Sequence, residues 1–479
     1  MLRRLFKDEK GMAMLLAAGV MVVAGILAFG VITIAKNDFP LTARDENSME
    51  TLHIAEAGTH RALWELGQFG RVEETTFTVP VGKGNAVVVA EQNPTTKILW
   101  KVKSTGKLRG AQRTVVCYVF NMSIWNMNMG LGDADSIVTS SNGTQGTTSV
   151  TGPFYARGDI SLSGNSAINC GPLFVKEGTL KFLNNATSLG SEGNPVAAFI
   201  QPAIDGNAAI WDEKAQRELE PGDPGVYVDP MSYICPNITL PPLRQLEAYR
   251  DYAAQESEEN VVAYPGIRNT YEPPLSGYKV LDNDTALSVG DVASRPMYTI
   301  GSRTGSFGTP GGEFAWDKDG RRLYVNGTVF VDGNLTIGDS ANSEINYYGK
   351  GTIVVNGDIY INGRLRPPTY PYTMSDENVL GLVTDESIYI DITSGNSTPS
   401  QYMADLCGAF FATRKVKFLS NNVSFVGSMI SGMLDFGGSN NNNHLFADGN
   451  LPNILPPNMP GGNDYITVTS SQSEINDLQ

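Results

Sequence analysis

The chain has 479 residues, a formal net charge of −15 and only 18% charged residues. Its length leaves room for two or three domains. The negative charge, with no basic stripe after the N-terminus, argues against a nucleic-acid surface. The 51 glycines and 26 prolines, with many Asn, Ser and Thr, favour β-structure with many turns over a helical enzyme.

The N-terminus combines a short leader with a long apolar run. Residues 1–10 read MLRRLFKDEK, Gly11 follows, and residues 12–35 form 24 positions without a charge. A helix needs roughly 20 residues to cross the hydrocarbon core. A secretory signal peptide would have a shorter apolar region followed by its cleavage site. Here the processing signal, Lys10-Gly11-Met12, precedes the apolar run, which is typical of a leader that is removed while the helix stays.

The membrane topology follows from the basic residues before the span. By the positive-inside rule they stay in the cytoplasm and the rest of the chain is exported. These residues are Arg3, Arg4, Lys7 and Lys10.

An amphipathic stem helix is expected after the span. Pro40 removes a helical N–H donor, so a kink or break is predicted there. The helix should resume over residues 42–66, and Gly67 and Gly70 should end it. Its apolar positions recur at helical spacing: Met49, Leu52, Ala55, Ala62, Leu63 and Leu66.

A small antiparallel sheet laid on the stem is predicted next. Four segments are rich in β-branched and aromatic residues and are separated by turn residues. They are residues 75–81, 86–90, 98–104 and 112–120, and one further short strand is expected at residues 465–469.

From about Met122, short apolar–polar alternations recur with Gly at the corners. Residues 326–335 match residues 356–365 at an offset of 30 residues, and residues 158–165 and 178–182 are weaker relatives. Such returns favour a β-solenoid, in which each coil buries its apolar residues on the next; two similar hairpins are the alternative. Pro-rich edges around a probable helix, residues 243–257, indicate an insertion.

The expected fold class is therefore α+β to mainly β. The predicted organisation is a leader (1–11), a transmembrane helix (12–35), a stem helix (36–70), an antiparallel sheet (71–121), the first part of a solenoid head (122–201), an insertion (202–317), the second part of the head (318–460) and a polar tail (461–479).

Catalytic or metal chemistry has little support. No nucleophile elbow, phosphate loop or metalloprotease helix motif is present, so no catalytic residue, cofactor or metal is predicted. The weighed candidates fall into three groups. They are the histidines His53, His60 and His444; carboxylates for glycan cleavage at Asp332, Glu344, Asp358 and Asp391; and turn-like calcium candidates at Asp133, Asp135, Asp317 and Asp319.

Four cysteines lie in the exported part. An even number there permits two disulfides with three connectivities, and four small buried thiols are the alternative. They are Cys117, Cys170, Cys235 and Cys407.

The N-terminal quarter resembles the PilX-type minor pilins of type IV pilus systems. The residues that carry the resemblance are the Lys10-Gly11-Met12 junction, residues 55–58 (AEAG), residues 61–63 (RAL), residues 103–106 (KSTG) and residues 111–115 (AQRTV). The later part looks like the uncharacterised β-rich domain found behind such stems, on residues 408–412 (GAFFA), 427–428 (GS) and 455–460 (LPPNMP).

The resemblance implies processing and assembly. A prepilin peptidase would cut after Gly11, and the new N-terminus at Met12 would be methylated. Major pilins carry Glu at the fifth mature position, which is Leu16 here. That glutamate is thought to pair with a neighbouring subunit's N-terminus, so its absence fits a low-copy subunit.

The sequence therefore predicts a non-enzymatic minor pilin-like protein. It would sit in the cytoplasmic membrane with its C-terminal part outside, at the pilus or cell surface. Its expected partners are the prepilin peptidase, other pilins or pseudopilins through the N-terminal helix, the membrane, and a surface or glycan ligand, without nucleic acid. The alternatives are a surface-anchored binding module outside any filament and a membrane-tethered solenoid enzyme acting on glycans.

Overall fold

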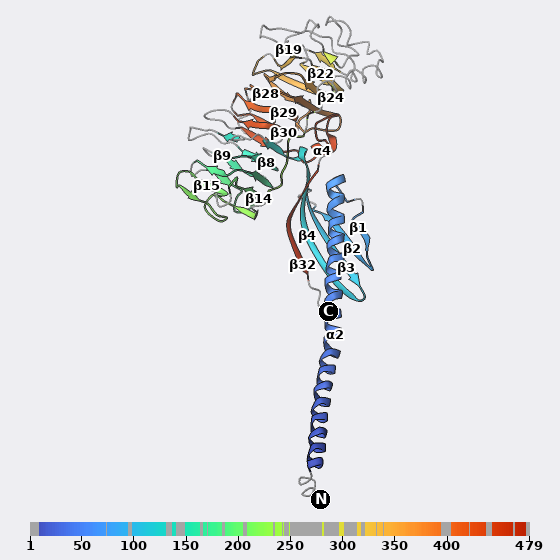
Figure 1. The fold of residues 1–479 in the computed structure, drawn as a ribbon. Helices are drawn as coiled ribbons and strands as arrows, with labels where there is room; N and C mark the ends of the chain where they lie inside the picture. Colours follow the sequence, from blue (N-terminus) through green and yellow to red (C-terminus); the bar gives the residue numbers. More distant parts are fainter. Residues whose placement is uncertain are drawn as a thin grey trace. The chain divides into compact units, whose positions relative to one another are not determined.

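The fold is mainly β, with a long apolar N-terminal helix, a small antiparallel sheet and a large β-rich region (Figure 1). The computed structural model describes residues 9–72, 74–93, 98–130, 137–139, 149–162, 166–169, 171–183, 187–204, 208–232, 235–241, 243, 249, 280–281, 297–300, 314–317, 321–331, 333–338, 340–393, 404–420, 422–436, 443–462 and 465–475. Two compact units emerge: a small unit of residues 1–121 and 467–479, and a large unit of residues 122–466.

Helix α2 is a single helix from Glu9 to Phe69, so the predicted break at Pro40 is wrong. A proline removes only one N–H donor, and the hydrogen bonds on either side keep the helix continuous. The helix ends as predicted at Gly70, whose φ of 70° is left-handed and whose N–H donates to the Leu66 carbonyl at 2.9 Å.

The small sheet has the order β1-β2-β3-β4-β32, and the four predicted strands are confirmed. Strands β1 to β4 are joined in sequence as antiparallel neighbours. Their bounds are Thr76–Val81, Gly84–Gln92, Leu99–Leu108 and Ala111–Ser123, and the C-terminal β32 is Tyr465–Ile475. The strand predicted near the C-terminus is thus longer than expected, and it completes the sheet beside β4.

The stem face of α2 packs on this sheet through small residues (Figure 1). Ala55, Ala62 and Leu66 are fully buried as predicted, whereas Met49 is exposed. A Cβ on Gly58 would lie 2.3 Å from Ser104 Oγ, and one on Gly106 would lie 2.2 Å from the Thr51 carbonyl oxygen. The AEAG and KSTG segments are therefore the two sides of one close helix–sheet contact.

The large unit is built from strands that pair in parallel with strands of the preceding and following turns of the chain. One row joins, in spatial order, β18 (Val280–Leu281), β22 (Gly327–Val331), β24 (Glu344–Val355), β27 (Asn378–Thr384), β29 (Leu406–Phe418), β30 (Ser424–Asp435), β5 (Asn128–Gly130), β8 (Phe154–Arg157), β11 (Leu173–Lys176), β14 (Val196–Gln201) and β17 (Val228–Ser232).

A second row runs beside it and shares the long strands β29 and β30. Its other members are β19 (Met297–Ile300), β23 (Asn334–Ile337), β25 (Ile359–Ile361), β28 (Ser387–Ile390), β6 (Ile137–Thr139), β9 (Ile160–Leu162), β12 (Leu180–Phe182) and β15 (Ile210–Asp212), which ends in an antiparallel hairpin with β16 (Arg217–Glu218).

A third row completes the described strands of the large unit and shares β24, β29 and β30. It contains β21 (Arg322–Val325), which forms a hairpin with β20 (Phe314–Asp317), then β26 (Arg364–Arg366), β31 (His444–Phe446), β7 (Ser149–Thr151), β10 (Ala167–Ile168) and β13 (Ser188–Leu189). A short 3-10 turn, Ile124–Asn126, precedes the rows, and helix α4, Leu451–Ile454, follows them.

The rows join halves of the unit that are far apart in sequence. The late strand β30 pairs with the early strands β5 and β6, and β31 pairs with β7. At this seam the Asn128 side-chain oxygen accepts from the Met429 N–H at 2.8 Å. The Trp125 indole N–H donates to the Pro460 carbonyl at 3.0 Å, so the chain enters and leaves the unit at neighbouring points.

The 30-residue repeat does not give the stacking register. Thr328 pairs with Thr352 and Thr336 with Tyr360, which are 24 residues apart. The repeat instead relates two turns between strands, one at Gly333 and one at Gly363. The backbone φ angles of these two glycines are nearly the same, 146° and 150°. The weaker relatives do stack, with Leu180 beside Ile160. Of the helix predicted at residues 243–257, all but Leu243 and Tyr249 lies outside the described residues.

A substitution at Gly58 tests the helix–sheet contact. In Gly58→Ala the added methyl meets Ser104 and Ala86, and overpacking costs about 1–3 kcal/mol. That exceeds the roughly 1 kcal/mol by which Ala favours a helix over Gly. We expect faster hydrogen–deuterium exchange of the β2 and β3 amides. Gly25→Ala, in the same helix with nothing within 4 Å, is the matched control and should leave exchange unchanged; equal behaviour of the two variants would contradict the contact.

Candidate functional site

The first half of α2 is an exposed apolar surface. Residues 13–33 form a segment of 21 residues with mean hydropathy 2.7, none of it buried. Leu16 is 71% exposed, and a Cβ on Gly19, Gly25 or Gly30 would meet nothing within 4 Å. This surface suits a bilayer or the close approach of other helices. Gly11 and Met12 lie within α2, and cleavage between them stays a prediction.

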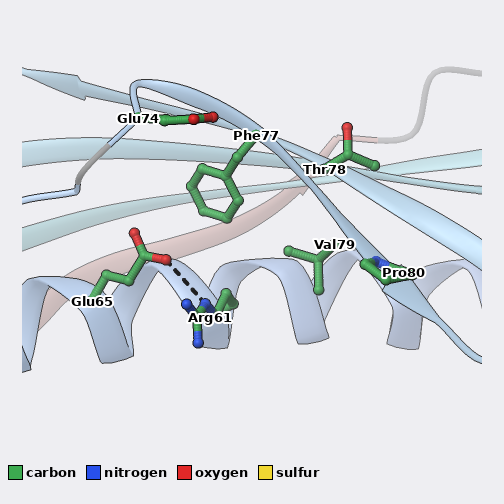
Figure 2. Close-up of a pocket in the computed structure, with 7 residues that line it drawn as sticks. All are labelled: Arg61, Glu65, Glu74, Phe77, Thr78, Val79 and Pro80. Atoms are coloured by element: carbon green, nitrogen blue, oxygen red, sulfur yellow. Dashed lines mark hydrogen bonds and ion pairs between the residues drawn. The ribbon is translucent and has the colours of Figure 1, made fainter.

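A groove lies between the second half of α2 and strand β1, the open edge of the small sheet (Figure 2). It encloses about 390 Å³ and is lined by Arg61, Glu65, Glu74, Phe77, Thr78, Val79 and Pro80. The Arg61 Nε donates to Glu65 Oε1 at 3.0 Å, and the same guanidinium lies 4.5 Å from the Trp64 ring centroid. Sequence reasoning did not find this groove, because β1 comes beside α2 only in the folded unit.

Proline protects the edge strand beside this groove. The Ala90 N–H donates to the Thr75 carbonyl at 2.8 Å, so by alternation the backbone of Thr76, Thr78 and residue 80 points to the open edge. Pro80 has no N–H to offer there. A proline at such a position limits edge-to-edge pairing with another strand.

In the large unit, the segment Leu455–Pro460 covers a line of small residues. Thr328, Thr352 and Gly381 are neighbours in adjacent strands. Asn458 Nδ2 donates to Thr328 Oγ1 at 2.8 Å, and Thr352 Oγ1 donates to the Pro457 carbonyl. A Cβ on Gly381 would lie 2.4 Å from Met459 Sδ. The LPPNMP segment thus binds three strands of the stack together.

The three histidines are dispersed. His53 Nδ1 lies 3.1 Å from Glu56 Oε2 on the exposed side of the stem, and His60 is also exposed. His444 is half-buried at the seam, where its Nδ1 is hydrogen-bonded to Ser149 Oγ at 2.5 Å. Among the described residues no group of three His, Cys, Asp or Glu side chains is placed to hold a metal ion.

The described carboxylates considered for glycan cleavage each bind a residue in another segment of the chain. Asp358 accepts from the Ser387 N–H at 3.1 Å, Asp391 accepts from the Ser420 hydroxyl, and Glu344 pairs with Arg366. These carboxylates join neighbouring turns of the chain. Asp332 and the calcium candidates Asp133, Asp135 and Asp319 lie outside the described residues; Asp317 ends β20.

The described cysteines form no disulfide with one another, so of the two possibilities left open by the sequence they follow the second, small buried thiols. Cys117, Cys235 and Cys407 are all buried, and Cys170 lies outside the described residues. Burial raises the pKa of Cys235 to about 12 and that of Cys407 further, which keeps both as neutral thiols. They pack as small apolar residues, the alternative considered from the sequence.

Comparison with known proteins gives a likeness to solved structures alone. No protein-family model matches the chain, and no curated protein matches it. Among solved structures, the chain is similar to the competence-associated pilin ComZ from Thermus thermophilus, with a TM-score of 0.46 and 14% identity over 90% of this chain and 97% of that chain. A likeness of this degree assigns no function.

The seam histidine predicts a pH dependence of stability. Burial lowers the pKa of His444 below its ordinary 6.5, so the folded state binds this proton less readily than the unfolded state. The large unit should lose stability as pH falls below about 6.5, and the loss should be complete below the folded pKa. Urea unfolding between pH 7.5 and 5, followed by tryptophan fluorescence, measures this loss of stability.

His444→Gln should flatten this dependence, while His60→Gln, an exposed stem control, should leave it unchanged. An unaltered pH dependence in His444→Gln would assign the loss of stability to other groups.

Proposed function

We propose that the protein is a membrane-anchored minor pilin-like subunit of the PilX type, which joins or primes a type IV pilus or related pseudopilus. The proposal rests on the different surroundings of the two halves of helix α2. Its first half is an exposed apolar span, and its second half is held against an antiparallel sheet. One continuous helix thereby links a membrane segment to a folded exported unit, as an assembly subunit requires.

The proposed maturation is cleavage by a prepilin peptidase between Gly11 and Met12, followed by methylation of the Met12 amine. The basic leader would stay on the cytoplasmic side. Glycines along the span leave room for neighbouring helices of other pilins or pseudopilins. Leu16 stands where major pilins carry Glu, which supports a low-copy role near a tip or in an initiating complex.

The large unit would be a β-solenoid head that faces outward for adhesion or assembly. Three features support this: parallel rows of short strands, paired residues that are 19 to 29 residues apart in the chain, and glycines with positive φ between strands, such as Gly333 and Gly363. The engagement of Glu344, Asp358 and Asp391 in strand-to-strand contacts favours a binding role over glycan cleavage.

Mass spectrometry of the mature N-terminus tests the maturation. In a strain with an active prepilin peptidase we expect the chain to begin at a methylated Met12. Gly11→Val should leave the full leader, because the branched side chain occupies the cleavage junction. Gly19→Val, a matched change within the apolar run, should still be cleaved. An intact Met1 in the unchanged protein would refute the proposal.

A second substitution tests the low-copy role. Leu16→Glu restores the carboxylate at the fifth mature position and should raise the amount of the protein in sheared filaments relative to membranes. Leu15→Glu places the same charge one position earlier, about 100° around the helix. This variant should not raise the amount of the protein in sheared filaments. Quantitative immunoblots of both fractions measure the ratio, and equal ratios for the two variants would contradict a specific pairing.

A further inference from the structure

A proline-stiffened turn in the large unit presents two tyrosines. Residues 367–373 (PPTYPYT) begin the connection from β26 to β27, which spans residues 367–377. Tyr370 is 66% exposed, and its ring meets Tyr372 edge to face, with centroids 5.8 Å apart. An exposed aromatic ring on a turn with fixed φ angles loses little freedom when a ligand covers it.

The base of this turn is anchored in the unit. Arg366 is buried, and its guanidinium carbon lies 3.8 Å from the Tyr372 ring centroid. The Cys407 thiol donates to the Tyr372 carbonyl at 3.4 Å. The Thr373 N–H donates to the Pro371 carbonyl at 2.7 Å. The position of Tyr372, on whose ring Tyr370 packs, is therefore set before any ligand arrives.

Charged groups beside the turn compensate one another. Glu344 pairs with Arg366, and its other oxygen lies 3.8 Å from Arg364 Nη1. Arg364 Nε in turn lies 3.5 Å from Asp405. Two guanidiniums and two carboxylates thus form a group with no net charge, from which the half-exposed Glu344 reaches solvent. The Arg366 Nε, buried in this group, has no hydrogen-bond partner within the described part of the chain.

A second tyrosine pair shows why this turn is distinctive. Tyr360 and Tyr389 stack face to face on neighbouring strands, with centroids 5.1 Å apart and planes at 12°. Lys415 Nζ lies 5.3 Å from the Tyr389 ring centroid. The facing sides of those rings are covered by each other, so they stabilise the stack. Tyr370 instead meets Tyr372 at 87° and keeps most of its surface open.

We infer that the Tyr370 turn is a saccharide-binding site. A sugar ring has an apolar C–H face, which would stack on Tyr370, and a rim of hydroxyls that both donate and accept hydrogen bonds and carry no charge. A neutral, mutually paired polar group suits an uncharged sugar better than an ionic ligand. A protein partner would need a broader apolar area than one exposed ring.

The site deepens the proposed function, because it gives the outward-facing head a ligand class. Failure of the saccharide-binding inference can be told apart from failure of the proposed function, because the N-terminal mass reports on maturation whether or not the head binds sugar.

Affinity electrophoresis tests the inference. The full chain is placed in phospholipid nanodiscs, which avoids sugar-headed detergents, and is run through native gels containing soluble starch, dextran, galactomannan or xylan. We expect retardation by at least one polysaccharide. Tyr370→Ala should weaken that binding by about tenfold or more, since stacking is lost, while Tyr370→Phe should retain it.

Tyr118→Ala, an exposed tyrosine of the small sheet, is the matched control and should bind as the unchanged protein does. Because Tyr370 is exposed, its replacement should not disturb folding, and thermal unfolding of each variant checks this. Absence of retardation in all four gels, or retardation that survives Tyr370→Ala, would overturn the inference.

Discussion

The large unit depends on the parallel pairing of β30 with β5 and β6. These strands lie about 300 residues apart in sequence, and their hydrogen bonds join the late turns of the chain to the early ones. Without this seam, two shorter stacks would each expose an unpaired strand edge, which favours aggregation. The buried Asn128, which accepts from Met429, fixes the register at this point.

The same seam explains how the unit can be entered and left at one place. From β5 the described strands pair successively through β8, β11 and β14 to β17, and from β18 they pair successively back through β22, β24, β27 and β29 to β30. The Trp125–Pro460 hydrogen bond closes this circuit, and the LPPNMP segment then lies across Thr328, Thr352 and Gly381.

The small unit has a different constraint, the close approach of α2 to its sheet. Gly58 and Gly106 leave no room for a Cβ, so the helix backbone lies close to β2 and β3. This contact holds the second half of a helix whose first half is wholly exposed. One continuous helix therefore joins an exposed apolar segment to a packed sheet, which is the structural basis of the proposed assembly role.

Much of the small unit was predictable from sequence. The strands β1 to β4, the buried Ala55 and Ala62 and the end of the helix at Gly70 all follow from local patterns. Pro40 was misread because a single lost hydrogen bond is outweighed by the continuous helix on either side. The groove of Arg61 and Phe77 and the compensated group around Arg366 were not predictable, since each joins residues that are brought together only by the fold.

The 30-residue repeat separates what the local sequence determines from what the fold determines. Sequence alone determined that the later chain forms short strands with glycine corners, because alternation and the need for positive φ are local properties. Tertiary structure alone decided which strands are neighbours. The pairs Thr328–Thr352 and Ile430–Met129 are set by the burial of side chains inside the unit and by the pairing of neighbouring strand edges. Both are properties of the assembled stack, and no single segment contains them.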